Sequence, residues 1–231
     1  MFRFKQFTIH QDRCALKVGT DGAVLGAWAR VEGAMRILDI GTGTGLLALM
    51  AAQRNADARI DAVEIDEAAA EQAQENVHAS PWADRIRVHW MDARRLSGSE
   101  PFDVVISNPP YYPGEMSAMD ASASIAKHSA ELKLDELVAT VNRLLADDGR
   151  FAVIVPANRE RDLCQATEDV GLLVVRRGPL HYLEGRPFKR VLLEFARHGG
   201  EVEHDPVTVE HSPGTYTEQY KALLVPFMLH F

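Results

Sequence analysis

The sequence predicts an α/β fold in which a mostly parallel sheet carries helices on both faces. Short apolar runs typical of buried strands alternate along the chain with amphipathic stretches typical of helices. That alternation favours a parallel sheet covered on both sides. With 231 residues, 46% of them apolar, the chain is long enough for one domain with a sizeable core.

The expected elements follow one another in regular order. Strands are expected at 35–40, 60–65, 86–90, 102–107 and 150–155, and helices at 45–54, 67–78, 134–145 and near 159–170. After Gly171 the pattern changes, because two β-rich runs at 172–175 and 191–195 are separated by Gly, Pro and a loop. These two runs predict an antiparallel pair at the edge of the sheet.

We expect the whole chain, 1–231, to form one domain, because no linker is long enough to separate either flank. Residues 35–155 form its central core. The N-terminal extension 1–33 contains a turn at 17–22 that leads into a helix at 23–29. The C-terminal part, 171–231, contains the two late strands and a tail whose last helix opens near 216–220.

The formal net charge of −8 argues at face value against a nucleic-acid partner, but the charges are unevenly placed. Residues 1–30 and 176–197 are basic, whereas 61–75 are acidic. Two basic ends fit a single defined nucleic acid better than non-specific coating, although ordinary solvated charges explain the counts equally well.

Compartment and metal content are also constrained by the sequence. Cys14 and Cys164 form no motif and are expected to be reduced thiols of a cytoplasmic protein. No apolar run reaches the length of a membrane span, and the N-terminus lacks the apolar segment of a signal peptide. The histidines show no metal-ligand spacing, so no metal is expected.

The most specific motif is Asn108-Pro109-Pro110-Tyr111, which follows the apolar run 104–107. Two prolines end the strand and stiffen the loop after it. The Asn108 side-chain oxygen and the Pro109 carbonyl can accept both hydrogens of a planar amino group, and Tyr111 can cover the flat face of its carrier. We therefore interpret the motif as a receptor for an exocyclic or amide nitrogen, with Pro110 and Tyr112 lining the substrate pocket.

A glycine loop follows the first core strand, with the spacing Gly41-x-Gly43-x-Gly45 and with Asp39 two positions before it. Glycines there allow close backbone approach to a ligand at a helix N-terminus. A carboxylate beside the loop would repel a pyrophosphate but would pair with an ammonium or sulfonium group.

Two further carboxylates stand at the next strand ends. Glu64 is 19 residues after Gly45 and is placed to accept both hydroxyls of a ribose. Asp92 follows the third strand and could accept from an adenine amino group, although a helix N-cap is an alternative role.

In their order and spacing these residues resemble the class I S-adenosylmethionine-dependent methyltransferases over roughly 35–155. The resemblance implies a Rossmann-like, mostly parallel seven-stranded sheet with an antiparallel last pair. It implies that S-adenosyl-L-methionine, which becomes S-adenosyl-L-homocysteine, binds in this core. Asp39 and the glycine loop would hold the methionine part, Glu64 the ribose and Asp92 the adenine, and Ile65 and Ala93 are further residues expected to bind the cofactor. In such enzymes the Asn-Pro-Pro-Tyr motif marks transfer to the nitrogen of adenine or glutamine, so Asn108, Pro109 and Tyr111 are the expected catalytic residues.

The flanks of the core resemble the bacterial tRNA1(Val) (adenine-37-N6)-methyltransferases more closely. The N-terminal residues Phe4-Lys5-Gln6-Phe7, the stretch 17–22 and the stretch 25–29 carry this likeness, together with 216–218 near the end. The resemblance implies that Thr20 and Asp21 lie beside the methionine end of the cofactor. It further implies that tRNA is the partner, with contacts expected from Lys127, Arg186 and Lys189.

Alternatives stay open. Glutamine methyltransferases of release factors usually carry a helical N-terminal domain, for which the residues before the glycine loop are too few. A nicotinamide-dependent oxidoreductase is disfavoured by Asp39 and by the glycine spacing. A catalytically silent RNA-binding module is disfavoured by the intact Asn108. The sequence does not fix the oligomeric state, and we expect a monomer.

Overall fold

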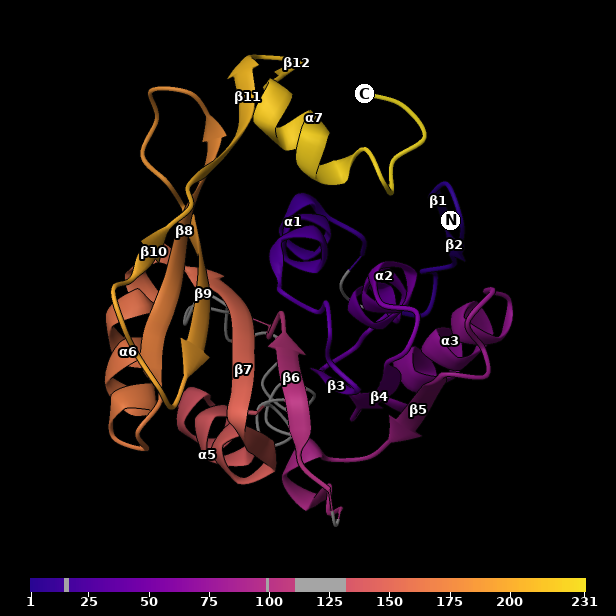
Figure 1. Cartoon of the computed structure of the whole chain (residues 1–231). Coiled ribbons are helices and arrows are strands. Elements are labelled where there is room, and N and C mark those ends of the chain that lie inside the picture. The colour runs from indigo at the N-terminus through magenta and orange to yellow at the C-terminus, as the bar shows by residue number, and fades with distance from the viewer. Residues whose placement is uncertain (15–16, 99, 111–131) are drawn as a thin grey trace, which may run out of the picture.

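The computed structural model describes residues 1–14, 17–98, 100–110 and 132–231. Three residues expected in the site, Tyr111, Tyr112 and Lys127, lie outside them. The described residues form a central sheet between two helix layers (Figure 1), and the predicted α/β class is confirmed.

The sheet contains all seven predicted strands in the order β5-β4-β3-β6-β7-β9-β8. Every neighbouring pair is parallel except β7 with β9 and β9 with β8, so the late antiparallel pair is also confirmed. The bounds are β3 Arg36–Ile40, β4 Arg59–Glu64, β5 Ile86–Trp90, β6 Phe102–Ser107, β7 Leu145–Pro156, β8 Leu173–Leu183 and β9 Arg190–Ala196.

The prediction that this pair forms the edge of the sheet is wrong. The tail adds β10 (Glu203–His204), β11 (Val207–Ser212) and β12 (Thr215–Tyr216), so the described residues form a ten-stranded sheet. Both β10 and β11 run parallel to β8, and β12 returns antiparallel to β11.

Strand β8 is longer than its sequence suggests, because Gly178 and Pro179 lie inside it rather than ending it. Here β10 pairs with Arg176 and Arg177, whereas β11 resumes opposite Leu180. The tail is interrupted opposite Gly178 and Pro179, where a proline needs no partner for its missing N–H. A Cβ on Gly178 would lie 2.7 Å from the carbonyl oxygen of Asp205, so the tail passes too close for any side chain.

Helices cover both faces of this sheet (Figure 1). On one face lie α1, α2 and α3; on the other lie α5 and α6. The bounds are α1 Thr20–Trp28, α2 Leu46–Arg54, α3 Glu67–His78, α5 Leu134–Leu144, α6 Glu160–Glu168 and α7 Glu218–Leu224, with 3-10 turns at Ala93–Arg95 (η1) and Ala157–Arg159 (η2).

Alternating strand residues separate two apolar cores, as the two-residue period of a strand requires. Ile37 and Ile106 enter the core under α1 and α2, whereas Leu38 and Val105 enter the core under α5. All four side chains are essentially inaccessible to solvent.

Helix α1 is buried from Gly22 to Trp28, so it lacks the polar face of an ordinary surface helix. It packs against α2 on one side and α7 on the other (Figure 1).

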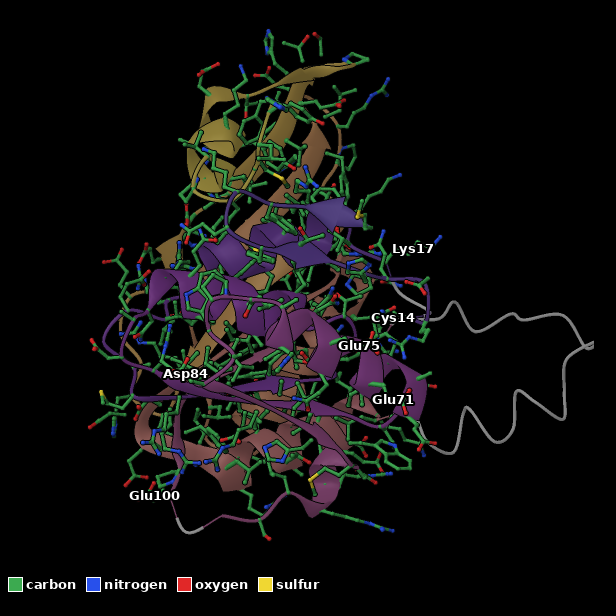
Figure 2. The ribbon with its side chains drawn as sticks, turned by 90° about the vertical axis from the view of Figure 1, so that its right-hand side faces the viewer. Cys14, Lys17, Glu71, Glu75, Asp84 and Glu100 are labelled. Atoms are coloured by element: carbon green, nitrogen blue, oxygen red, sulfur yellow. The ribbon has the colours of Figure 1, made fainter. Side chains whose placement is uncertain are left out.

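The chain before α1, which includes β1 (Phe2–Arg3) and β2 (Thr8–Ile9), is fixed to α3, because the backbone amide of Arg13 donates to Gln72 Oε1 at 2.9 Å. Figure 2 shows Cys14 and Lys17 on the side of the molecule that carries Glu71 and Glu75 of α3. Arg13 pairs with both of these glutamates, and Lys17 then stands at the entrance to α1.

Among the described helices, none is both long and apolar enough to cross a lipid bilayer.

Candidate active site

The strand-end residues expected in the site, as far as the structure describes them, lie along one edge of the sheet. Because β3 to β6 are parallel, their carboxyl ends share that edge. From β6 outward the order is Asn108, the glycine loop after β3, Glu64 at the end of β4, and Asp92 after β5. Ligands of open α/β sheets bind outside the carboxyl ends of the strands, so this edge is the candidate site.

A cavity of about 410 Å³ opens at this edge, beside Asn108. Four segments of the chain line it: the turn into α1, the glycine loop, the residues after β6, and the facing ends of β8 and β9. The lining residues are Lys17, Val18, Gly19, Thr20, Asp21, Gly22, Gly41, Thr42, Gly43, Thr44, Leu46, Leu47, Asn108, Pro109, Pro110, Tyr182 and Arg190.

Two glycines of the loop face this cavity with exposed backbone. Gly41 and Gly43 have φ angles of +73° and +54°, and a Cβ at either position would meet nothing within 4 Å. A ligand can therefore approach the Cα atoms of both glycines closely, while their N–H groups donate to the Val63 carbonyl and to Glu64 Oε2. Gly45 has φ +84° and precedes α2, but a Cβ there would lie 3.6 Å from Ala73 Cβ. Gly45 thus lets α2 begin and pack near α3, and it is not among the residues that line the cavity.

Asp39 is fully buried beneath the loop. Its Oδ2 accepts from the Thr42 hydroxyl at 2.5 Å and from the backbone amide of Ala48 at 3.2 Å. Its Oδ1 has no hydrogen-bond partner among the described residues. Burial raises the pKa of Asp39 to about 7, against the hydrogen bond from Thr42. One carboxylate oxygen thus holds the loop on α2, and the other is a buried acceptor without a partner in the described parts of the chain. Asp39 itself does not line the cavity.

Glu64 is occupied by backbone amides. Its Oε2 accepts from Gly43 at 2.8 Å, and its Oε1 accepts from Ile65 at 2.9 Å and from Asp66 at 3.0 Å. The contact with Gly43 ties the end of β4 to the glycine loop. Ile65 beside it is 42% exposed, which leaves an apolar side chain at this edge.

Asp92 caps the 3-10 turn η1 by accepting from the backbone amide of Arg94 at 2.9 Å. The Arg94 side chain also pairs with Asp92 and with Glu136, and its hydrogen bond holds the pKa of Asp92 below the usual range. Ala93 is buried in the neighbouring core. The N-cap alternative for Asp92 is therefore present in the structure, and an adenine contact stays a prediction.

Thr20 and Asp21 line the cavity, and Asp21 is engaged by two residues from β8 and β9. Its Oδ2 accepts from Arg190 Nε at 2.9 Å, and its Oδ1 accepts from the Tyr182 hydroxyl. Gly22 follows in the same turn, and a Cβ there would lie 3.6 Å from Asn108 Nδ2 and 3.1 Å from Leu46 Cδ2. The start of α1 therefore packs directly on Asn108.

Sequence reasoning missed Tyr182 and Arg190 as site residues. Their contacts with Asp21 span 161 and 169 residues, and no periodic or spacing signal reaches that far. The only available indication was that Arg190 belongs to the basic segment 176–197.

Asn108 and Pro109 lie at the end of β6, where Pro109 is buried and Pro110 is exposed. Arg186 and Lys189 are exposed in the hairpin between β8 and β9. Because β8 ends and β9 begins at the edge that carries Asn108, this hairpin lies at the same end of the sheet, but neither Arg186 nor Lys189 lines the cavity.

A second, larger cavity of about 730 Å³ lies at the opposite edge, around the amino ends of β3, β4 and β5. Its walls carry acids and bases in similar number, and none of the predicted site residues contributes to it. It is lined by Met35, Arg36, Asp57, Arg59, Ile60, Asp61, Asp84, Arg85, Arg87 and Glu100. Within the described ranges no cluster of histidine, cysteine and acidic side chains could hold a metal ion.

Solved structures of methyltransferases share the fold of this chain. A predicted O-methyltransferase from Agrobacterium tumefaciens superposes with a TM-score of 0.64 at 19% identity, covering 90% of this chain and 96% of that one. TrmN from Thermus thermophilus superposes with a TM-score of 0.56 at 21% identity, covering 77% of this chain and 48% of that one. At such identities the likeness shows the shared fold alone.

Sequence comparison establishes the family. The family model described as the methyltransferase small domain matches residues 23–163. The tRNA1(Val) (adenine(37)-N6)-methyltransferase of Phocaeicola vulgatus is 46% identical over 229 residues, covering 99% of this chain and 97% of that protein. The protein of the same name from Aeromonas hydrophila is 43% identical over 229 residues, with the same coverage. The chain therefore contains a methyltransferase small domain and belongs to the tRNA1(Val) (adenine(37)-N6)-methyltransferase family.

Proposed function

We propose that this protein transfers a methyl group from S-adenosyl-L-methionine to the N6 amino group of adenosine 37 in tRNA1(Val). One observation carries the proposal: the Asn108-Pro109-Pro110 receptor and the glycine loop line a single cavity. A donor held on the loop would thus face an acceptor held by Asn108.

The residues present fit this cofactor. Its ammonium group needs a carboxylate oxygen, and Asp39 Oδ1 is a buried acceptor without a partner among the described residues. Its close approach needs open backbone, which Gly41 and Gly43 provide. When bound, the cofactor supplies an electrophilic methyl group on a sulfonium centre.

Glu64 would hold the ribose hydroxyls, and its present hydrogen bonds determine which of its oxygens a hydroxyl can reach. Gly43 N–H occupies Oε2, so a ribose hydroxyl has to share or replace that hydrogen bond. Oε1 can keep its bonds to Ile65 and Asp66, which fix the carboxylate in place. Asp92 and Ile65 would then border the adenine of the cofactor.

Asn108 and Pro109 act on the acceptor nitrogen. An adenine amino group is a poor nucleophile, because its lone pair is delocalised into the ring. By accepting its two hydrogens, the Asn108 side-chain oxygen and the Pro109 carbonyl favour a tetrahedral nitrogen with a localised lone pair. The same acceptors stabilise the positive charge that develops there as the nitrogen takes the methyl group and the bond from sulfur to methyl breaks. The methylated nitrogen then releases one of its two protons to water, so no strong base is required.

The RNA would approach over the hairpin between β8 and β9. Its exposed Arg186 and Lys189 stand at the active-site end of the sheet and suit phosphate groups. An adenine in a folded anticodon loop has to leave its stack to enter a cavity of this kind.

The test is methylation of total tRNA with labelled cofactor, followed by nucleoside mass spectrometry and mapping of the modified tRNA. We expect N6-methyladenosine at position 37 of tRNA1(Val), and none with the Asn108→Ala variant. Methylglutamine formed on a release factor, with unmodified tRNA, would overturn the proposal. Calorimetry should also detect S-adenosylhomocysteine and not NADH, and the reverse would indicate an oxidoreductase.

A further inference from the structure

Asp21, Tyr182 and Arg190 form a cluster that joins the start of α1 to the ends of β8 and β9. The carboxylate of Asp21 accepts from Arg190 Nε at 2.9 Å and from the Tyr182 hydroxyl. All three residues line the cavity that contains Asn108. None of them belongs to the glycine loop or to the Asn-Pro-Pro motif.

The cluster fixes Arg190 while leaving much of its guanidinium available. Asp21 accepts from Nε, and the only other side-chain hydrogen bond of Arg190 within the described residues joins Nη1 to the Lys189 carbonyl at 3.4 Å, near the limit of such a bond. The side chain is 33% exposed, and Arg190 is one of the residues that line the cavity. A guanidinium has five N–H donors in one plane, and two of them can bind an oxyanion together.

Tyr182 keeps Asp21 in this role. Burial, together with the bond to Asp21, raises the pKa of Tyr182 well above its usual value, so its hydroxyl stays protonated and donates at neutral pH. The carboxylate of Asp21 is held from two sides, and the orientation of Arg190 is therefore set before any ligand arrives.

The sheet order places Arg190 on the acceptor side of Asn108. The glycine loop and Glu64 follow β3 and β4, on one side of β6, whereas Arg190 begins β9, two strands beyond β6 on the other side. Arg190 pairs with Pro156 at the end of β7, at the active-site edge. At about 4.8 Å per strand, the two strands separate it from Asn108 by roughly 10 Å, the scale of one nucleotide.

We propose that Arg190, oriented by Asp21, binds a phosphate that flanks the adenosine to be methylated. This inference rests on the proposed function. With the adenine amino group at Asn108, the phosphate of the same nucleotide lies at the mouth of the cavity. Lys189 and Arg186 follow on the hairpin and continue the basic path for the RNA backbone.

The first test compares Arg190→Gln with wild type, using a transcript of tRNA1(Val). We expect the KM for tRNA to rise at least tenfold, while the dissociation constant of S-adenosylhomocysteine changes less than threefold. The slope of log(kcat/KM) against log salt should become less steep by about 0.7–0.9, as one phosphate contact is lost. Arg87→Gln is the matched control, because Arg87 is exposed at the opposite edge, and it should behave as wild type.

A second test identifies the phosphate. Anticodon stem–loops carrying one methylphosphonate, either 5′ or 3′ of adenosine 37, remove a single charge. At one of these positions, wild type should lose activity as Arg190→Gln does, and the two changes together should cost no more than either alone.

The possible results distinguish a phosphate-binding role of Arg190 from a cofactor-binding role and from a purely structural one. Weaker S-adenosylhomocysteine binding by Arg190→Gln, with an unchanged salt slope, would assign Arg190 to the cofactor carboxylate and overturn the inference. Wild-type kinetics of Arg190→Gln would mean that Asp21, Tyr182 and Arg190 have only a structural role, and would also overturn the inference.

If Arg190→Gln does not fold, Arg190→Lys replaces it. We then expect a raised KM for tRNA and a wild-type salt slope, and a wild-type KM would overturn the inference. A wild-type protein that leaves tRNA unmethylated would instead overturn the proposed function.

Discussion

Asn108 stands at the point where β6 ends and α1 begins to pack, so its side chain is placed by two elements. We expect Asn108→Ala to lower kcat for tRNA methylation at least a hundredfold, because the acceptor for the amino hydrogens is lost. Binding of S-adenosylhomocysteine should change only a few-fold. Asn108→Asp keeps an acceptor oxygen and should retain more activity than the alanine variant; equal loss in both would contradict the acceptor role.

Glu64 joins the glycine loop to the end of β4 through its contact with Gly43. We expect Glu64→Ala to raise the dissociation constant of S-adenosylhomocysteine at least tenfold, because charge-assisted hydrogen bonds are worth roughly 1.5–3 kcal/mol each. Calorimetry measures the change. Glu67→Ala, at an exposed position on α3, is the control. An unchanged constant in Glu64→Ala would remove this carboxylate from the site.

Asp39 is a buried carboxylic acid, and its effect on the free energy of unfolding depends on pH. Its folded pKa is about 7, raised by burial, whereas an unfolded aspartate titrates near 4. Between these values the folded protein holds a proton that the unfolded chain has released. Stability therefore falls as the pH rises from about 4 to about 7, and levels off above that.

It follows that Asp39→Asn should be more stable than wild type at pH 8, by about 2 kcal/mol or more, with the difference shrinking toward pH 5. Denaturant unfolding at the two pH values measures this. The same variant should bind S-adenosylhomocysteine more weakly at pH 8, because it lacks the carboxylate that we propose pairs with the cofactor ammonium. A stability difference that does not vary with pH would contradict this account of Asp39.

At the scale of elements, α1 depends on close contact with α2. A Cβ on Gly26 would lie 2.5 Å from the sulfur and 3.2 Å from the Cβ of Met50, which is fully buried. This distance explains why a helix that gains from alanine elsewhere has glycine here. The contact also fixes the height of α1 above the sheet, and with it the position of Asp21 and Gly22 in the cavity.

We expect Gly26→Ala to destabilise the protein by about 1–3 kcal/mol, because overpacking forces α1 away from α2. In a Met50→Ala background the same change should cost clearly less, since the sulfur and Cε of Met50 are then gone and only the Cβ at 3.2 Å remains. Denaturant unfolding of the four proteins gives the coupling free energy. Additive effects would show that the two residues do not compete for that space.

On the scale of the whole molecule, an acidic protein has to bind an acidic partner. The overall charge of −8 coexists with a basic hairpin at the active-site end, so we expect binding through a local surface. The Arg186→Ala/Lys189→Ala double variant should weaken tRNA binding and reduce the slope of log K against log salt by about 1.4–1.8.

Arg59→Ala/Arg87→Ala is the matched control for this experiment. It removes the same charge from exposed positions at the opposite edge of the sheet. A filter-binding titration across salt concentrations should show no change in its slope. Equal losses in the two double variants would mean that net charge, rather than the hairpin, governs RNA binding.

Much of the fold and part of the candidate site could be predicted from the sequence. Strand and helix positions follow from local periodicity, and β5, β6 and α3 were predicted to the residue. Gathering Asp39, Glu64, Asp92 and Asn108 at one edge follows from parallel strands alone, since every such strand ends on the same side.

The tertiary structure decided what surrounds those residues. The sequence did not reveal that Arg190 and Tyr182 reach Asp21, or that the tail passes close to Gly178. It also did not reveal that Arg94 pairs with Asp92 while backbone amides donate to Glu64. The contacts of Asp21 join segments more than 160 residues apart, and the local ones depend on side-chain rotamers, neither of which leaves a periodic trace. The sequence by itself therefore determined the sheet and the edge at which the candidate site lies. Only long-range packing decided which side chains close the cavity, because only the folded chain brings α1 against β8 and β9.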